Sequence, residues 1–220
     1  PQRVLPIFKD AGITVIHKCT SIRHAKKAES IGCDIISVDG FECAGHTGED
    51  DVPNMVLLPV AAEQLKVPFI ASGGLGSGRQ LAAALALGAD GMNMGTRFLA
   101  TRECWVHDNV KQALVKGTEL DTQLIFRRLR NTSRLYKNSP AKQLAVMDAD
   151  PTKTFEDMKH IAAGAKAPAV YRDGDIEAGT WSASAVMGLI HDVPSCEELI
   201  QRIVRDATQI MQKRLPAMVA

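Results

Sequence analysis

Residues 67–98 read VPFIASGGLGSGRQLAAALALGADGMNMGTRF, and this stretch decides the predicted fold. The apolar run 69–71 is typical of a short buried strand, and a glycine-rich turn and the strong helix formers of 80–87 follow it. Gly88 can end that helix, because glycine adopts the left-handed conformation without a steric penalty. A second strand-like run begins at Gly91. This order of strand, helix and strand predicts a parallel βα repeat.

The same pattern occurs four times in the first half of the chain. Strand-like runs begin near residues 13, 35, 68 and 91. Helix-compatible stretches lie between them: one after the capping residue Ser21, one at 55–65 and one at 80–87, which we expect to be buried on all sides. Four such units could form an open doubly wound sheet. They could also form half of a (β/α)8 barrel, which takes about 30 residues a unit.

The pattern changes in the second half of the chain. Residues 106–116 are expected to form a helix, and residues 197–215 an amphipathic terminal helix. Residues 117–150 are rich in arginine and lysine, and we interpret them as a solvated helical face or lid rather than an anion site. We therefore divide the chain into a barrel half over 1–116 and a helical lid with C-terminal helices over 117–220.

The composition restricts the classes of function. The 26 Lys and Arg residues and 25 Asp and Glu residues give a formal net charge of +1, which argues against nucleic-acid binding through phosphate neutralisation and against a polybasic membrane surface. No run reaches the roughly 18 apolar residues of a membrane span. The five cysteines include no CxxC pair and indicate reduced thiols. We expect a cytoplasmic protein that acts on small molecules and binds neither nucleic acid nor a membrane.

Polar residues follow the expected strands, where parallel α/β folds carry their functional residues. Lys18 follows the first strand, where it could steady an anionic cofactor or simply lie on the rim. The run 39–51, DGFECAGHTGEDD, follows the second strand and places His46 among three glycines. Imidazole suits proton transfer near neutral pH, although His46 could instead bond a nearby carboxylate such as Glu49 or Asp50. A metal site of Cys43 and His46 would need two more ligands, and we expect none.

Two glycine turns could bind a phosphate. The turn 72–79, SGGLGSGR, leads into the helix of 80–87, so it presents free N–H groups and the positive end of the helix dipole. Its glycine spacing is neither that of Walker A nor GxGxxG. The turn 93–98, NMGTRF, follows the next strand and offers the N–H groups of Gly95 and Thr96. Barrels frequently build a phosphate site from the loops after strands 7 and 8. If the runs that begin near residues 68 and 91 are these two strands, the two glycine turns meet on one phosphate.

At these residues the sequence resembles the nitronate monooxygenase family, formerly called 2-nitropropane dioxygenases, which are FMN-dependent (β/α)8 TIM barrels. The similarity spans the chain and is densest in HKCT at 17–20, in the run 39–51, in ASGG at 71–74 and in the turn 93–98. Within the family, HKCT and DGFECAGHTGEDD are most similar to a branch described as FMN-dependent NADH:quinone reductases. Thr47 stands where the family more often has proline.

The resemblance implies an FMN site that can be assigned residue by residue. His46 is implied as the catalytic base beside the flavin ring. The residues implied in FMN binding are Lys18, Asp39, Gly45, Ser72, Gly73, Gly74, Met94, Gly95 and Thr96. The phosphate is expected on the backbone of Gly73, Gly74, Gly95 and Thr96.

The resemblance also implies that the four βα units are strands 5 to 8 of the barrel. Strands 1 to 4, roughly 100 residues at about 30 a unit, are then absent from a chain that starts at Pro1. We expect a C-terminal fragment of a longer protein. Such a half barrel leaves unpaired strand edges and an incomplete active site.

The leading functional hypothesis is FMN-dependent oxidation of alkyl nitronates with O2. An alternative is an NAD(P)H:quinone reductase that uses the same FMN site, with NADH or NADPH as the reductant. Two other hypotheses stay open: a catalytically incomplete fragment, and a phosphate-sugar barrel enzyme without flavin. The oligomeric state does not follow from the sequence.

Overall fold

The computed structural model describes residues 2–219, which form two compact units. The first unit consists of the described residues up to Glu42, of Asp50–Met94 and of those from Arg202 onward, and the second consists of Cys43–Glu49 and Gly95–Gln201. Pro1, with which the expected fragment begins, lies outside the described residues. The division of the chain at residue 116 stays a prediction.

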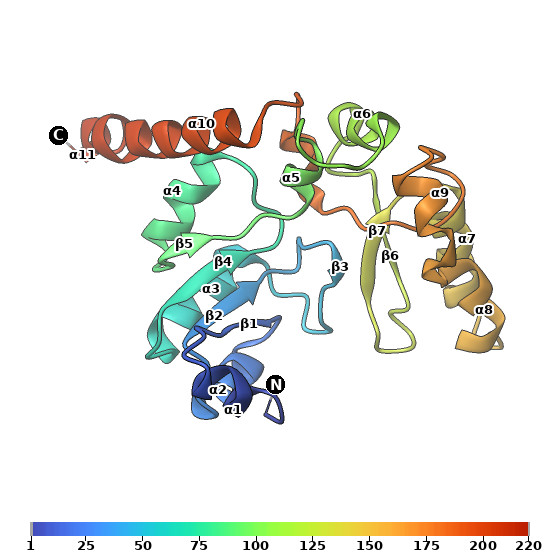
Figure 1. The fold of residues 1–220 in the computed structure, drawn as a ribbon, viewed down its shortest axis with the longest axis horizontal. Helices are drawn as coiled ribbons and strands as arrows, with labels where there is room; N and C mark the ends of the chain where they lie inside the picture. The colour runs from blue at the N-terminus through green and yellow to red at the C-terminus, as the bar shows by residue number, and fades with distance from the viewer. Residues whose placement is uncertain (1, 220) are drawn as a thin grey trace. The chain divides into compact units, whose positions relative to one another are not determined.

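The first unit is built on one parallel sheet (Figure 1). Its strands, in order across the sheet, are β1 (Ile16–Cys19), β2 (Ile35–Asp39), β4 (Phe69–Ser72) and β5 (Gly91–Met92). Its helices along the chain are α1 (Leu5–Asp10), α2 (Ile22–Ser30), α3 (Asn54–Gln64) and α4 (Gly78–Ala86). Neighbouring strands all pair in parallel, so the predicted α/β class is confirmed. That these strands are the fifth to eighth of a barrel stays a prediction.

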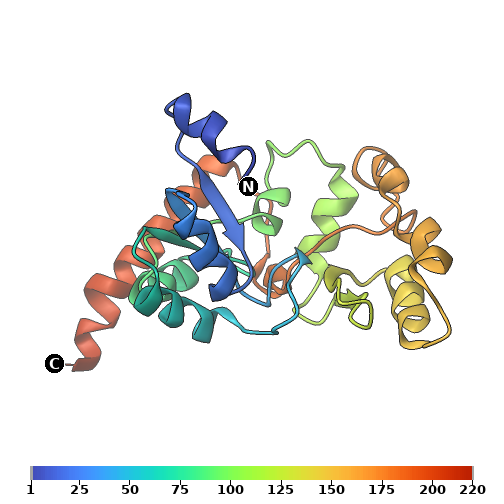
Figure 2. The ribbon, with the colours of Figure 1, turned by 90° about the horizontal axis from the view of Figure 1, so that it is seen from below.

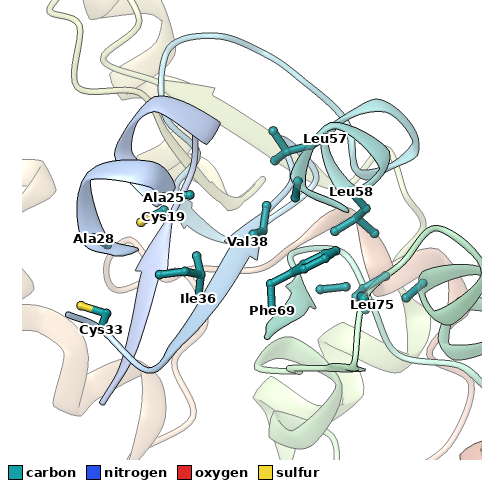
Figure 3. Packing of buried hydrophobic residues seen from close by; sticks show 14 of the residues in the cluster. Cys19, Ala25, Ala28, Cys33, Ile36, Val38, Leu57, Leu58, Phe69 and Leu75 are labelled. Carbon is teal, nitrogen blue, oxygen red and sulfur yellow. The ribbon is translucent and has the colours of Figure 1, made fainter. Parts of the chain in front are cut away.

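The core of the first unit lies between this sheet and the helices α2 and α3 (Figure 3). Ile36 and Val38 lie two residues apart in β2, as do Phe69 and Ala71 in β4. Side chains two residues apart in a strand lie on the same side, and all four of these point to one face of the sheet. None of the four is more than 4% exposed, and Leu58 of α3 joins them at 1%. Burial of a side chain such as Leu58 stabilises the fold by about 2 kcal/mol. The opposite face of the sheet carries isoleucines at the amino ends of the strands and polar residues toward their carboxyl ends.

Local hydrogen bonds decide where β1 and α2 begin. Ser21 caps α2 as predicted, because its side chain accepts the backbone N–H of His24. The first strand begins at Ile16 rather than near residue 13. The Val15 N–H donates to the carboxylate of Asp34 at 2.8 Å, while the Val15 oxygen accepts the N–H of Ile35 at 3.2 Å, so the chain just before β1 is held partly by a loop side chain and partly by β2.

Helix α4 is less buried than its sequence predicts. Ala82 and Ala84 are buried, but Ala83 and Ala86 are exposed. The expectation that residues 80–87 are buried on all sides is therefore wrong for the described chain. The reason is that Ala84 packs into the core of the sheet and Gly78 packs against the terminal segment, whereas the side of the helix that carries Ala83 and Ala86 is left uncovered. An all-apolar composition thus indicates a good helix former rather than complete burial.

A terminal helical segment completes the first unit (Figures 1 and 2). Helix α10 (Cys196–Gln209) continues into the π-helix η3 (Ile210–Arg214), and α11 (Pro216–Val219) ends the described chain. The helix predicted over 197–215 is confirmed, with a change of hydrogen-bond register at its end. Among residues 2–219, no helix has both the length and the apolar composition needed to cross a membrane.

Gly78 lets the terminal segment approach α4 closely. A Cβ at Gly78 would lie 2.7 Å from the backbone oxygen of Ile203 and 2.9 Å from the backbone nitrogen of Ala207. Both distances are shorter than a van der Waals contact, and the atoms that it would meet are backbone atoms that cannot rotate away. Close packing of α4 against the terminal segment therefore requires glycine at position 78.

The second unit contains a small antiparallel sheet surrounded by short helices (Figure 1). Its strands, in order across the sheet, are β3 (Gly45–His46), β7 (Ser133–Tyr136) and β6 (Thr122–Ile125). Its α-helices are α5 (Thr96–Leu99), α6 (Asp108–Lys116), α7 (Ser139–Ala149), α8 (Phe155–Ala162) and α9 (Ala167–Tyr171). Its 3-10 helices are η1 (Gly164–Lys166) and η2 (Ala185–Leu189). The helix predicted over 106–116 is confirmed as α6.

Residues 117–150 differ from the expected solvated helical lid. The β6–β7 hairpin occupies the first half of this range, and only α7 is helical. Thr132 and Arg134 are 1% and 9% exposed, so they do not belong to a solvated face. Each strand has four residues with charged or polar members, which is too short for a period of two to be recognised. The pairing with β3, some 90 residues earlier in the chain, decides this structure instead.

Replacement of Gly78 by alanine tests the packing of the terminal segment. We expect Gly78→Ala to lower the free energy of unfolding by about 1–3 kcal/mol through overpacking and to expose residues 202–219 to proteolysis. Gly164→Ala is the matched control, since no atom lies within 4 Å of a Cβ there. Urea unfolding and limited proteolysis measure both effects. Equal stability of the two variants would contradict the close approach.

Candidate functional site

The polar face of the parallel sheet gathers several predicted site residues of the first unit. Lys18 is in register with Ser37, and Asp39 is in register with Ser72. Side chains alternate along a strand, so these four residues share the face opposite to the apolar core. Ser37, Asp39 and Ser72 are each at most 3% exposed. Their position at the carboxyl ends of parallel strands is where such folds bind ligands.

Lys18 and Asp39 form an ion pair on this face. The Lys18 ammonium lies 2.9 Å from Oδ2 of Asp39, and the side chains are 57% and 2% exposed. Within the described residues, Oδ1 of Asp39 and the hydroxyl of Ser37 have no hydrogen-bond partner. Buried polar atoms are nearly always hydrogen-bonded. These two atoms are therefore well suited to hydrogen-bonding groups of a ligand.

Residues 72–74 form the glycine turn after β4, the first part of the 72–79 segment, and this turn is held through its carbonyl groups. The Ser72 oxygen accepts the N–H of Gly40 at 3.0 Å and the side-chain amide of Asn54 at 3.0 Å. The Gly73 oxygen accepts the same amide at 2.6 Å. The oxygen of Gly74, the last residue of the turn, accepts the side-chain amide of the first-turn glutamine of α4 at 2.6 Å.

The N–H groups of the same turn point elsewhere. Within the described chain, the N–H groups of Gly73 and Gly74 have no acceptor. Both glycines have positive φ angles, 87° and 71°, a conformation that other residues rarely adopt. Two adjacent backbone donors without an acceptor are the arrangement that binds an anionic oxygen. In the same unit, Asn93 donates to the Ser72 hydroxyl at 3.3 Å, and the half-buried Met94 follows it.

In the second unit, Thr96 is fixed by its hydroxyl. Its Oγ1 accepts the backbone N–H of Ser184 at 3.1 Å, so the hydroxyl hydrogen can be donated to another group. The next residue, Arg97, is 2% exposed and donates to Oδ1 of Asp192 at 2.7 Å. Gly95 has no atom within 4 Å of a Cβ position. The start of α5 is thus tied to the chain near residue 190, and Gly95 lies open.

His46 lies on β3 with a free side chain. His46 is paired with Ser133 of β7 and is exposed, and within residues 2–219 its imidazole has no hydrogen-bond partner. The carboxylate of Glu49 instead accepts the N–H and the hydroxyl of Thr132 at 2.8 and 2.7 Å. The alternative in which Glu49 bonds the histidine is therefore wrong. A free, exposed imidazole on a fixed loop can exchange a proton with a ligand.

The loop around His46 is fixed by β7 on both sides. The Gly45 position faces Arg134, and a Cβ on Gly45 would lie 3.9 Å from the hydroxyl of Ser182. The N–H of Thr47 donates to the Thr132 oxygen at 3.3 Å. A proline at this position could not make that hydrogen bond.

The predicted site residues divide between the two units. The first unit contains Lys18, Asp39, Ser72, Gly73, Gly74 and Met94, and the second contains Gly45, His46, Gly95 and Thr96. That both sets bind one FMN stays a prediction. No cluster of three His, Cys, Asp or Glu side chains suited to a metal ion occurs among residues 2–219. Cys43 contacts the backbone oxygen of His46 at 3.7 Å.

Two residues that organise the site are not indicated by the sequence: Asn54 and Gln80 hold the carbonyl groups of the glycine turn. The sequence does single out Glu49, but as a partner of His46 rather than of Thr132. Asn54 and Gln80 each lie in the first turn of a helix, where amide side chains commonly bond nearby backbone groups. That position is the only signal in the sequence, and it does not say which backbone groups are bonded.

Comparison with known proteins assigns the chain to a family. The family model for nitronate monooxygenase matches residues 1–206. The chain belongs to the nitronate monooxygenase family.

The relatives carry more than one name. Two are named (3aS,4S,5R,7aS)-5-hydroxy-7a-methyl-1-oxo-octahydro-1H-indene-4-carboxyl-CoA dehydrogenase. That of Rhodococcus jostii is 35% identical over 94% of this chain and 68% of its own length, and that of Mycobacterium tuberculosis is 34% identical over 96% and 70%. The nitronate monooxygenase of Paraburkholderia phytofirmans is 27% identical over 96% of this chain and 59% of its own. The chain spans about two thirds of the length of the two dehydrogenases.

Solved structures agree with the fold. FabK from Thermotoga maritima matches 99% of this chain and 68% of its own with a TM-score of 0.91 and 29% identity. Nitroalkane oxidase from Streptomyces ansochromogenes matches 96% of this chain and 62% of its own with a TM-score of 0.79 and 24% identity, which shows the fold alone.

The thiol of Cys19, behind the polar face, gives a testable pH dependence. Burial raises its pKa from 9.0 to about 11, with smaller contributions from Cys33 and Asp39. Between these values the unfolded chain loses a proton that the folded chain keeps, so stability falls as the pH rises from 9 to 11, by up to about 3 kcal/mol. Urea unfolding at pH 8–11 should show a steeper fall for the wild type than for Cys19→Ala. Parallel curves would argue against the raised pKa.

Proposed function

We propose that this chain forms the FMN-binding part of an oxidoreductase, with oxidation of alkyl nitronates by O2 as its leading activity. The observation that carries the proposal is the glycine turn after β4. Its carbonyl groups are all bonded within the protein, and the N–H groups of Gly73 and Gly74 are left for a ligand. A phosphate group is the natural partner of such donors at the start of a helix.

The residues of the first unit fit the chemistry of FMN. The backbone donors of Gly73 and Gly74 suit its phosphate. Oδ1 of Asp39, buried and without a partner among the described residues, can accept a hydrogen bond from a ribityl hydroxyl or a ring N–H. The Lys18 ammonium, held by Asp39, offers a positive charge to an electron-rich ring. When bound, FMN would supply the capacity to accept two electrons from a substrate and pass them on.

The proposed role of His46 is to move a proton. A neutral nitroalkane must lose the proton of its α-carbon to become a nitronate, and an imidazole with no other partner can accept it. The Glu49–Thr132 hydrogen bonds hold the loop that carries the imidazole, which limits the loss of entropy when substrate binds. Gly95 and Thr96 are proposed as further phosphate donors.

A second candidate is a dehydrogenase that acts on a coenzyme A thioester. The two relatives named as CoA dehydrogenases are 35% and 34% identical over nearly the whole chain, against 27% for the nitronate monooxygenase of similar coverage. The α-carbon of a thioester is also acidic, so His46 could perform the same proton transfer. The named relatives give no support to the quinone reductase alternative.

Flavin binding and turnover test the proposal directly. The purified chain, incubated with FMN and dialysed, should keep flavin absorbance, and it should consume O2 when an alkyl nitronate is added. Turnover of an acyl-CoA with an artificial electron acceptor, without nitronate oxidation, would favour the second candidate. Bound FMN without turnover of either substrate would identify a catalytically incomplete chain. A colourless protein that phosphate sugars stabilise would support the barrel enzyme without flavin.

Gly74→Ala should abolish FMN binding. A Cβ at Gly74 would lie 2.5 Å from the Cβ of Glu42, and the φ angle of 71° strains any other residue. The turn must then move, and its N–H groups with it. Gly91→Ala is the matched control on the neighbouring strand, because its Cβ would make an ordinary contact at 3.8 Å. Fluorescence titration with FMN measures both, and retained binding in Gly74→Ala would place the phosphate elsewhere.

His46→Ala should reduce turnover of a neutral nitroalkane by about 10²–10⁴-fold, the usual contribution of a general base, with FMN affinity unchanged. Turnover of the preformed nitronate should fall far less, because no proton has to be removed. Steady-state O2 uptake with the two substrates measures the difference. An equal loss with both substrates would assign His46 to binding rather than to proton transfer.

A further inference from the structure

We propose that Asn54 is the positioning residue of the phosphate-binding turn. Its side-chain amide holds the carbonyl groups of Ser72 and Gly73 on the α3 side, so that the N–H groups of Gly73 and Gly74 are presented to the ligand. The inference rests on the proposed FMN site and adds to it the residue that sets the affinity for the phosphate end of the cofactor.

The side-chain amide of Asn54 bonds two consecutive carbonyl groups. Nδ2 of Asn54 donates to the Ser72 oxygen at 3.0 Å and to the Gly73 oxygen at 2.6 Å, so both of its hydrogens are used. Each carbonyl shares a planar peptide group with the N–H of the next residue. The two hydrogen bonds therefore fix the directions of the Gly73 and Gly74 N–H groups.

Asn54 is itself held in place by Glu42. Its backbone N–H donates to both carboxylate oxygens of Glu42, at 3.1 and 3.2 Å. A Cβ on Gly40 would collide with the side chains of both residues, and a Cβ on Gly74 would lie 2.5 Å from that of Glu42. Glycines at 40 and 74 thus make room for the Glu42–Asn54 pair directly under the turn.

The burial of Asn54 lowers the stability of the fold. The residue is 7% exposed, and its Oδ1 has no hydrogen-bond partner within the described chain. A buried polar atom without a partner lowers stability. An asparagine retained at this cost, with both amide hydrogens on the turn, indicates a requirement of the site rather than of the fold.

The test compares two flavins that differ only in the phosphate. Asn54→Asp is almost isosteric but cannot donate to the two carbonyl groups. We expect it to weaken FMN binding by about 10- to 100-fold, the loss typical of hydrogen bonds to a charged group, and to leave the weaker binding of riboflavin unchanged. A merely structural role would lower the affinity for both flavins together. Asn54→Ala serves as the second variant if the aspartate protein does not fold.

Asn138 provides a matched control in the second unit. It is 2% exposed, and its Nδ2 donates to the carbonyl groups of Ile176 and Gly179 at 2.7 and 2.8 Å. Asn138→Asp therefore removes an equivalent pair of hydrogen bonds to two carbonyl groups, while Oδ1 of residue 138 can still accept the N–H of Ala141 at the start of α7. It should lower the melting temperature but keep the ratio of FMN to riboflavin affinity.

A second measurement uses inorganic phosphate alone. Phosphate should raise the melting temperature of the wild type above that in chloride of equal ionic strength, and this increase should disappear in Asn54→Asp. Retained preference for FMN over riboflavin in Asn54→Asp would overturn the inference and leave the proposed function intact. A wild type that binds phosphate but not FMN would overturn the proposed function, and the phosphate comparison would still decide the role of Asn54. A wild type that binds neither would overturn both.

Discussion

The backbone carbonyl groups of residues 72–74 must be hydrogen-bonded inside the protein if the N–H groups of the same turn are to bind an anion. Two helix-borne amides meet that requirement, Asn54 from α3 and Gln80 from α4. The parallel sheet supplies the rest, because pairing of β2 with β4 brings Gly40 to the Ser72 oxygen. The candidate site thus depends on the hydrogen bonds that hold the carbonyl groups of the turn, and the glycines only make the conformation of the turn possible.

The loop that carries His46 follows the same principle with different means. A two-residue strand is too short to be stable by itself, and β3 exists because β7 pairs with it. Glu49 and Thr47 add side-chain and backbone bonds to Thr132. In both units, buried hydrogen bonds fix a short functional segment and leave its chemically active groups free.

Much of the first unit could be predicted from local patterns. The strands of residues 35–39 and 69–72, the capping role of Ser21 and the glycine turn all follow from periodicity and residue type, which act over a few residues. The antiparallel hairpin of 122–136 could not be predicted, since its strands are short and polar and its stability comes from a partner far along the chain. The sequence also overstated the burial of α4, because composition does not reveal how many faces of a helix are covered.

The sequence by itself determined the α/β class and the family, and it predicted which residues bind a phosphate or move a proton, because motif chemistry is local. Only the tertiary structure decided which carbonyl groups Asn54 bonds, that Asp39 holds Lys18, and that Glu49 bonds Thr132 and leaves His46 free. The physical reason is that a hydrogen bond is satisfied by whichever partner the fold brings within about 3 Å, and that partner lies 18 to 83 residues away along the chain.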